Sequence, residues 1–106
     1  MVMKMKRIAA TSSTTAATDT KLYTVSAVKQ ATGILFITNT STATKFRVSL
    51  EASGAVAMAQ YISYDTDIDA GETQTIEGIS LYNLQELWVR STSGNVAFTF
   101  VGAEEV

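Results

Sequence analysis

The chain of 106 residues contains no cysteine, no histidine and no proline. The lack of cysteine excludes disulfide bonds and thiolate chemistry. The lack of histidine removes the commonest general base near neutral pH and the commonest ligand of transition metals. Serine and threonine are plentiful, but no histidine is present to activate them. We therefore expect a protein that is not an enzyme.

Long apolar segments are also missing. No stretch approaches the ~20 apolar residues that span a bilayer. The first ten residues carry Lys4, Lys6 and Arg7, but the apolar run that follows the charges of a signal peptide is absent. The sequence therefore predicts a soluble chain with no membrane partner and no cleaved signal.

The net charge of −2 conceals an uneven distribution along the chain. Up to Arg47 there are seven basic residues and one acid, Asp19, whereas from Val48 onward Arg90 is the single base among nine acids. Strands from the two halves of a chain interleave in a β-sandwich, and such interleaving would average the charge in space. The alternative is that basic residues of one copy meet an acidic patch on a neighbour.

The first 20 residues differ in composition from the rest. Residues 9–20 are nearly all Ala, Thr and Ser, with no large apolar side chain to bury. Such a segment cannot offset the conformational entropy that it loses on ordering. We therefore divide the chain into an extended N-terminal arm, residues 1–20, and one β-sandwich domain, residues 21–106.

From residue 21 onward the pattern is that of strands joined by short turns. In Thr44–Ala52, the apolar residues Phe46, Val48 and Leu50 alternate with polar ones, which predicts an inward and an outward face. Seven or eight short strands, spaced by about ten residues, favour an all-β fold, an antiparallel β-sandwich of the jelly-roll kind. The expected strands are Lys21–Lys29, Gly33–Asn39, Thr44–Ala52, Gln60–Asp69, Glu72–Leu81, Glu86–Ser91 and Val96–Val101.

Finer expectations concern the faces of these strands. In Gln60–Asp69, we expect Ile62, Tyr64 and Ile68 to point inward. Gly78 interrupts an apolar pattern and predicts a β-bulge. The polar residues of Thr44–Ala52 that should point outward are Lys45, Arg47, Ser49 and Glu51.

Asp65, Asp67 and Asp69 resemble the start of a calcium-binding loop, in which alternating carboxylates ligate the ion. Such a loop needs Gly at its sixth position and Glu at its twelfth, and those positions hold Ala70 and Ile76. Alternating Asp residues are also typical of the solvent face of a strand. We expect a solvated face with no metal and no cofactor; a weak surface calcium site is the alternative.

Aromatic and arginine residues are the candidates for contact with other proteins, because Trp, Tyr and Arg are enriched in binding hot spots. The bases near the N-terminus are few, no aromatic residue accompanies them, and the net charge is negative, so we expect no nucleic-acid partner. Tyr82 suits the rim of a sandwich and a subunit contact equally. The candidate interface residues are Lys4, Lys6, Arg7, Tyr61, Tyr64, Trp88 and Arg90.

Short strand and turn motifs follow one another in this order: K-L-Y-T-V (Lys21–Val25), I-x-N-T (Ile37–Thr40), F-x-V-S-L (Phe46–Leu50), Y-I-x-x-D (Tyr61–Asp65), I-x-A-G-E-T (Ile68–Thr73), L-x-V-x-S (Leu87–Ser91) and F-x-x-x-G-x-E (Phe98–Glu104). Together they resemble a family of small β-sandwich proteins encoded among bacteriophage virion genes. That family often has V-P-A-G where this chain reads Val25-Ser26-Ala27-Val28. The resemblance implies a virion structural component, either a head decoration or cement protein or a tail-associated protein, and it implies no catalytic residue.

These expectations favour a bacteriophage virion structural protein that decorates or cements the capsid. The sandwich would bind the head surface, with the major capsid protein as its partner, and the arm would lie along a neighbouring subunit of a homo-oligomer. The protein would be located in the virion, assembled in the host cytoplasm. The alternative is a tail, neck or fibre-associated module that recognises a host glycan. A weak hydrolase is the third hypothesis, and it requires a clustered, buried pair of carboxylates.

Overall fold

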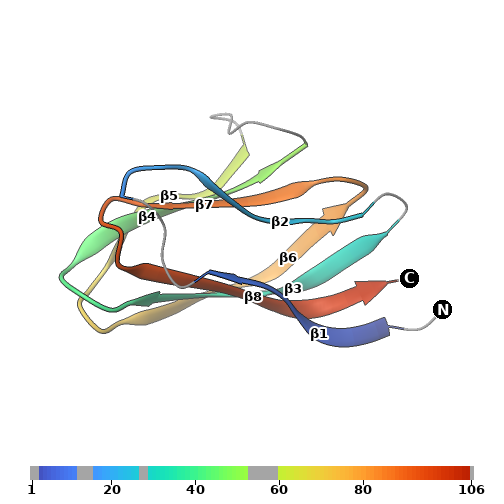
Figure 1. The fold of residues 1–106 in the computed structure, drawn as a ribbon, viewed down its shortest axis with the longest axis horizontal. Helices are drawn as coiled ribbons and strands as arrows, with labels where there is room; N and C mark the ends of the chain where they lie inside the picture. The colour runs from blue at the N-terminus through green and yellow to red at the C-terminus, as the bar shows by residue number, and fades with distance from the viewer. Residues whose placement is uncertain (1–2, 12–15, 27–28, 53–59, 106) are drawn as a thin grey trace.

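The computed structural model describes residues 3–11, 16–26, 29–52 and 60–105 (Figure 1). This part of the chain forms eight β-strands, and it contains no helix long and apolar enough to cross a lipid bilayer. The strands are β1 (Met3–Thr11), β2 (Thr20–Thr24), β3 (Gln30–Asn39), β4 (Thr44–Glu51), β5 (Tyr61–Ile68), β6 (Thr73–Tyr82), β7 (Glu86–Ser91) and β8 (Val96–Glu105).

The strands form two four-stranded sheets that lie one above the other (Figure 1). Sheet A has the order β1-β8-β3-β6, and sheet B has the order β2-β7-β4-β5, with every pair antiparallel. Consecutive strands alternate between the sheets, apart from β4 and β5, which share sheet B. This arrangement is an eight-stranded jelly roll. The predicted antiparallel β-sandwich is confirmed.

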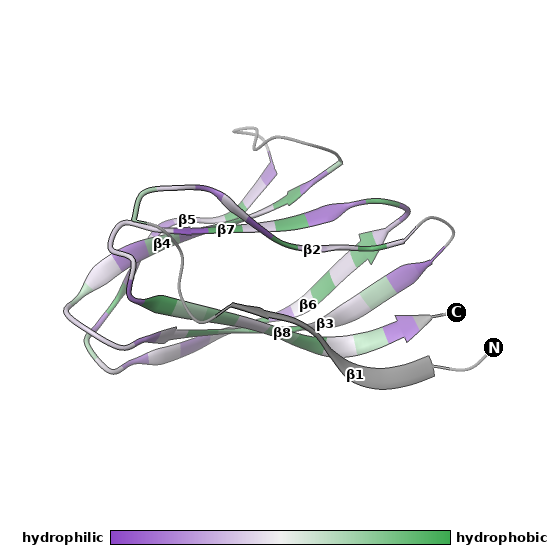
Figure 2. Cartoon of the chain, viewed as in Figure 1, coloured by the Kyte–Doolittle hydropathy of each residue, from purple (hydrophilic) through white to green (hydrophobic). Residues whose placement is uncertain are grey.

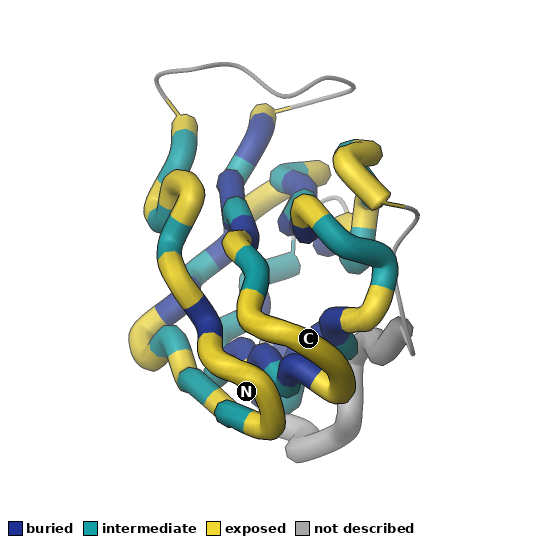
Figure 3. The backbone as a smooth tube through the Cα atoms, turned by 90° about the vertical axis from the view of Figure 1, so that its left-hand side faces the viewer, coloured by how far each residue is buried: buried dark blue, intermediate teal, exposed yellow. Residues whose placement is uncertain are grey.

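The core lies between the two sheets. Phe46 of sheet B and Phe98 of sheet A meet edge to face, with ring centroids 6.4 Å apart and ring planes at 72°. Phe46 and Val48 are buried and Leu50 packs against the core, as the alternation in this strand predicts. Apolar segments alternate with polar ones along the strands (Figure 2), and buried segments lie in both layers (Figure 3). The large side chains that are fully buried are Phe46, Phe98, Phe100, Leu35, Ile37, Ile68, Leu81, Leu87, Val25, Val48, Val89 and Val96.

β3 and β8 approach each other closely at two glycines. Gly33 and Gly102 are direct cross-strand partners. A Cβ atom on Gly102 would lie 2.0 Å from the carbonyl oxygen of Thr32, and one on Gly33 would lie 2.3 Å from that of Val101. Because both distances are far below van der Waals contact, these positions accept only glycine without a shift of the backbone.

β6 bulges at Gly78, where φ is 73°. Its pairing with β3 shifts between Gly33 and Leu35, which lie opposite Ile79 and Ile76. The bulge predicted at this glycine is confirmed. A bulge at an edge strand also disrupts the row of main-chain groups onto which another chain could pair.

β5 departs from the expected alternation. Its pairing with β4 shifts on both sides of Val48, and Asp65 has a positive φ of 47° in the resulting bulge. Ile62 and Tyr64 are 44% and 50% exposed, so the prediction that they point into the core is wrong, whereas Ile68 is buried as predicted. An extra residue in a strand moves the following side chains to the opposite face, and a period of two in the sequence cannot reveal it.

The outward side of β4 is exposed over only part of its length. Ser49 and Glu51 were expected to face solvent, but each is 2% exposed. Their pairing with β7 continues without interruption from Arg47, so they lie on the same face as this arginine. The expected face is therefore confirmed, and the expected exposure of these two residues is wrong.

Near the N-terminus, residues 3–11 form a strand of sheet A and do not extend away from the domain as an arm. Met3–Thr11 forms β1 at the edge of sheet A and pairs with β8 of the same chain, with Lys4 opposite Glu104 and Arg7 opposite Val101. An edge strand is joined to its sheet through main-chain hydrogen bonds along one side, and these do not depend on the side chains of the strand. That residues 1–20 contact a neighbouring subunit stays a prediction.

Candidate functional site

The outer face of sheet B gathers arginine and aromatic side chains from neighbouring strands. β4 and β7 pair in continuous register, with Arg47 opposite Arg90 and Ser49 opposite Trp88. Side chains alternate along a strand, and the residues between these positions are in the core. Arg47, Arg90 and Trp88 therefore project from the outer side of the sheet, where Trp88 and Arg90 are half-buried.

Two tyrosines of the edge strand β5 join this face through Arg47. The rings of Tyr61 and Tyr64 meet edge to face, with centroids 4.8 Å apart and planes at 75°. The guanidinium carbon of Arg47 lies 4.2 Å from the ring centroid of Tyr64 and 6.0 Å from that of Tyr61. A cation–π contact at an exposed site stabilises by about 0.5–1 kcal/mol. We refer to Arg47, Tyr61, Tyr64, Trp88 and Arg90 as the sheet B face.

Asp65 fixes the position of the arginine. Its carboxylate accepts hydrogen bonds from Nε of Arg47 at 2.6 Å and from Nη2 at 3.3 Å. This bidentate contact holds the pKa of Asp65 below its ordinary value and raises the pKa of Arg47 above its own. The bulge in β5 puts Asp65 and Tyr64 beside the same guanidinium, so the cluster is organised before any partner binds.

Four ion pairs among the described residues join strands of sheet B to each other or to the segment that precedes β2. If the chain is divided after residue 47, each pair joins a base from one half to an acid from the other half. The uneven charge of the sequence is therefore averaged within one molecule, as the first of the two interpretations expected. The pairs are Lys21–Glu86 (3.6 Å), Lys45–Asp67, Arg47–Asp65 (2.6 Å) and Arg90–Asp19 (3.8 Å).

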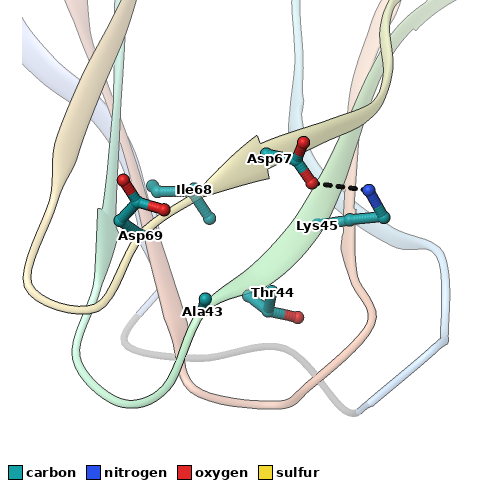
Figure 4. Close-up of a pocket in the computed structure, with 6 residues that line it drawn as sticks. All are labelled: Ala43, Thr44, Lys45, Asp67, Ile68 and Asp69. Carbon is teal, nitrogen blue, oxygen red and sulfur yellow. Dashed lines mark hydrogen bonds and ion pairs between the residues drawn. The ribbon is translucent and has the colours of Figure 1, made fainter.

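A shallow, open depression lies at the start of β4 (Figure 4). The ion pair between Lys45 and Asp67 lies beside it, and the main-chain N–H of Asp69 donates to the Glu72 carboxylate at 2.7 Å. Within the described ranges, no group of three or more acids is placed to hold a metal ion. Ion pairs thus account for Asp65 and Asp67 without a bound cation. The lining residues are Ala43, Thr44, Lys45, Asp67, Ile68 and Asp69.

A pair of carboxylates lies at the other end of β4. Glu51 and Glu86 are direct cross-strand partners, and both are buried. Glu86 accepts a hydrogen bond from Nε1 of Trp88 at 3.0 Å and pairs with Lys21. This is the buried pair of carboxylates that the hydrolase hypothesis requires. The contacts of Glu86 orient Trp88 on the sheet B face.

The structure places the predicted interface residues in two groups. One group lies on the sheet B face, and the other lies on β1 at an edge of sheet A, where the side chains are outside the described part. Sequence reasoning missed Arg47 as a member of the first group. Its outward position was readable from the alternation in β4, but the bulge that brings Tyr64 against it was not. The first group is Tyr61, Tyr64, Trp88 and Arg90, and the second is Lys4, Lys6 and Arg7.

Comparison with known proteins supports the fold. The sequence matches no protein-family model and no curated protein. The chain superposes on a chain of the solved structure of infectious bursal disease virus, Gx strain, with a TM-score of 0.54 and 12% sequence identity over 97% of its length. It spans 32% of that viral chain, which is about a third. At this identity the similarity establishes a shared fold.

Proposed function

We propose that this chain is a structural protein of a bacteriophage particle, a decoration or cement protein that binds the major capsid protein through the sheet B face. The observation that carries the proposal is the cluster of Arg47, Tyr61 and Tyr64. The Tyr64 ring is half exposed, and the cluster lies on the same face as Trp88 and Arg90.

The composition of this face is that of a protein contact. Tyr, Trp and Arg are the residues that most often dominate binding energy in protein interfaces. The contacts of Arg47 with Asp65 and Tyr64 restrict these side chains already in the unbound chain. Restriction before binding reduces the entropy that is lost on association, which would otherwise be about 0.5–1.5 kcal/mol for each immobilised side chain.

The fold agrees with a role in a virus particle. Jelly rolls recur in viral capsid proteins, and the solved structure that this chain superposes on is that of a virus. Because jelly rolls also host other functions, the fold alone assigns none. A particle repeats each contact many times, so a face of modest affinity suffices through avidity.

The same proposal makes the chain a binding protein and not an enzyme. General acid–base catalysis needs a carboxyl that reaches a substrate. In the buried pair of Glu51 and Glu86, the second carboxylate is engaged by Lys21 and Trp88. This supports a structural role for the pair.

The proposal also gives the N-terminal segment a role in the contact between neighbouring copies of the chain. β1 is the first strand of the chain and lies at an edge of sheet A, so the same main-chain hydrogen bonds can form with β8 of a neighbouring copy. Deletion of residues 1–18 should leave a folded chain, because β8 remains paired with β3 and all four strands of sheet B remain. The truncated chain should fail to enter particles. Normal incorporation would contradict the proposal that residues 1–20 contact a neighbouring subunit.

A second candidate is a tail, neck or fibre-associated module that recognises a host glycan. The observation that favours it is the half-exposed ring of Tyr64, since aromatic rings stack on sugars and jelly rolls also form lectin domains. This candidate predicts specific binding of the purified chain to a glycan array, lost in Tyr64→Ala. Decoration of the head predicts no such binding.

Incorporation into particles tests the leading proposal. Particles are produced from the genome that encodes the chain, with equal amounts of wild type and Tyr64→Ala, and the ratio in purified particles is measured by mass spectrometry. Loss of a hot-spot side chain should reduce incorporation about tenfold or more. Thr75→Ala, an exposed substitution on sheet A, should be incorporated like wild type. Equal incorporation of Tyr64→Ala would overturn the assignment of the face.

A further inference from the structure

The outer side of sheet A has an uncharged centre on its two middle strands, β8 and β3. In β3, the residues on either side of Leu35 point away from the core, because Leu35 is fully buried and side chains alternate along a strand. In β8, the residues on either side of the fully buried Phe100 do the same. These four residues are Ile34, Phe36, Thr99 and Val101, and we refer to them as the sheet A centre.

The two middle strands differ in the size of these side chains. Ile34 of β3 lies directly opposite Val101 of β8, and Phe36 lies directly opposite Thr99. The larger member of each pair belongs to β3, and Phe36 is 38% exposed. The outer side chains of β3 therefore extend further from the sheet than those of β8. A partner with the reverse distribution of sizes would cover both strands.

Two charges of opposite sign lie at the two edges of sheet A, level with Ile34 and Val101. Arg7 of β1 is the direct cross-strand partner of Val101. Glu77 lies in the bulge of β6 opposite Ile34; it is exposed, and it follows Ile76, which packs against the core. β1 and β6 are three strand spacings apart, about 14 Å, whereas charges in physiological salt are screened beyond about 8 Å. The two charges therefore interact little within one chain.

We propose that the sheet A centre of one copy of this chain packs face to face on that of a second copy. The two copies are related by a two-fold axis that runs parallel to the strands, midway between β3 and β8. Rotation about this axis places β3 of each copy over β8 of the other. Phe36 then lies against Thr99 of the second copy, and Ile34 lies against Val101, so that each larger side chain meets a smaller one. Large residues opposite small ones allow the two layers to interdigitate without voids.

The charges at the edges favour a second copy in this orientation. The same rotation places β1 of each copy over β6 of the other, so Arg7 comes level with Glu77 of the second copy, and this pairing occurs twice. A two-fold axis perpendicular to the strands would place β1 over β1, which has three bases, and β6 over β6, whose one charge is Glu77. Opposite charges at the rim of an apolar contact fix its register, and like charges oppose it.

The size of this face suits a dimer. β1 has nine residues, and β3, β6 and β8 have ten each. With ~4.8 Å between strands and ~3.3 Å for each residue, the face measures about 600 Å². Two copies would bury about 1,200 Å² in total, which is the lower limit for specific stable interfaces and exceeds most crystal contacts. Two sheets stacked in this way lie ~10 Å apart, with their strands inclined by about 30°.

The contact uses the same surface on both copies, so it is isologous and closes at two. It leaves the outer side of sheet B uncovered on each copy, because sheet B lies on the opposite side of the sandwich from the contact (Figure 1). The dimer therefore presents two sheet B faces in opposite directions. The inference goes beyond the proposed function and does not depend on it.

Sedimentation velocity of the full chain over a concentration series tests the contact. The wild type should form dimers as its concentration rises. Phe36→Glu should remain monomeric, because it places an unpaired charge in an apolar contact. Its unfolding temperature in dilute solution should equal that of the wild type, since Phe36 lies outside the core. Ile62→Glu, the same change at an exposed apolar residue of sheet B, should dimerise like the wild type.

Charge reversal tests the two-fold axis. Arg7→Glu and Glu77→Arg should each raise the Kd of the dimer about tenfold, because each puts like charges opposite each other at two places. An equimolar mixture of the two variants should dimerise with about the Kd of the wild type, because a base then faces an acid at both places. Lys45→Glu, an equal change of charge on sheet B, should dimerise like the wild type.

The outcomes separate the contact from its orientation. A wild type that stays monomeric, or Phe36→Glu that dimerises like the wild type, would overturn the contact. A mixture of Arg7→Glu and Glu77→Arg that dimerises no better than either variant alone would overturn the axis parallel to the strands. Dimerisation of the mixture also shows that both variants are folded, so that loss of the dimer in either one alone reports on the contact.

Discussion

Arg90 and Asp19 form an ion pair, with Nη1 of the arginine 3.8 Å from Oδ1 of the aspartate. They are the one base after residue 47 and the one acid before it. The other described pairs, such as Arg47 with Asp65, also join the two halves of the chain. The strand order therefore brings bases and acids from the two halves of the sequence together, so that their charges are paired on one face. Because the charges on this face are paired within the molecule, the aromatic rings are what it offers to a partner.

Loss of Asn39 should destabilise the fold strongly. Asn39 is fully buried; its Nδ2 donates to the carbonyls of Thr42 at 2.8 Å and Asp69 at 3.1 Å, and its Oδ1 accepts from the N–H of Ser41 at 3.1 Å. Asn39→Leu leaves these main-chain groups without partners and should lower the free energy of unfolding in urea by about 3 kcal/mol.

A matched control for Asn39 is the neighbouring Thr38, whose hydroxyl forms an exposed hydrogen bond with that of Thr73. Thr38→Val should change the free energy of unfolding by less than about 0.5 kcal/mol. Equal losses for Asn39→Leu and Thr38→Val would contradict the role of the buried amide.

Two glycine substitutions should differ in size. Gly102→Ala places a Cβ atom 2.0 Å from the carbonyl oxygen of Thr32 and should lower the free energy of unfolding by about 2–3 kcal/mol. Gly78→Ala meets no atom within 4 Å and should lose about 1 kcal/mol from its positive φ alone. Thermal or urea unfolding of both variants decides the order, and the reverse order would mean that β3 and β8 do not approach as described.

Much of the fold is readable from the sequence. The alternation around Phe46 and Val48 predicts the faces of β4, and Gly78 predicts the bulge in β6. β1 was predicted as part of an arm, because the small residues at positions 9–20 offer no large apolar side chain to bury. In the strand itself, Met3 and Met5 alternate with Lys4 and Lys6, a period of two that the composition of the segment does not reveal.

The site is readable in part. Trp88 and Arg90 were predicted as interface residues, and their alternation with Leu87 and Val89 places them together on one face of β7. The cluster around Arg47 depends on the bulge at Asp65, which no glycine marks. A bulge at a non-glycine residue shifts the register without a local signal, so the meeting of Tyr64 and Arg47 required the structure.

Acid should weaken the fold partly through Asp65. The hydrogen bonds from Arg47 hold the pKa of Asp65 below its ordinary value of ~3.9. The contact therefore stabilises the fold above that value, and this stabilisation is lost as the pH falls through the lower pKa of the folded state. Asp65→Asn should flatten the acid limb of stability against pH, measured by urea unfolding. Parallel acid limbs in variant and wild type would contradict the pair.

At high pH, the hydroxyl of Tyr23 should ionise later in the folded chain than in the unfolded chain. Burial, followed by the negative charge of Glu104, raises the pKa of Tyr23 to about 12. The value in the unfolded chain is ~10, so the stabilisation is complete below that pH and is lost as the pH rises through about 12. Ultraviolet titration should show one late tyrosine in wild type, and Tyr23→Phe should remove it. Four tyrosines that ionise together would contradict this environment.

The hydroxyl of Tyr23 is buried without a hydrogen-bond partner of acceptable geometry in the described residues. Tyr23→Phe should therefore be at least as stable as wild type at neutral pH, since an unpaired buried hydroxyl costs about 1–3 kcal/mol. A loss of stability in urea unfolding would show that the hydroxyl has a partner in solution.

Electron cryomicroscopy of particles produced with and without this chain tests the central claim most directly. The account predicts a jelly roll on the head, repeated by the symmetry of the capsid, with Tyr64 and Trp88 of the sheet B face against a neighbouring protein. The density should vanish from particles that lack the chain. Density at the tail with this face open to solvent, or identical particles in both preparations, would contradict the account.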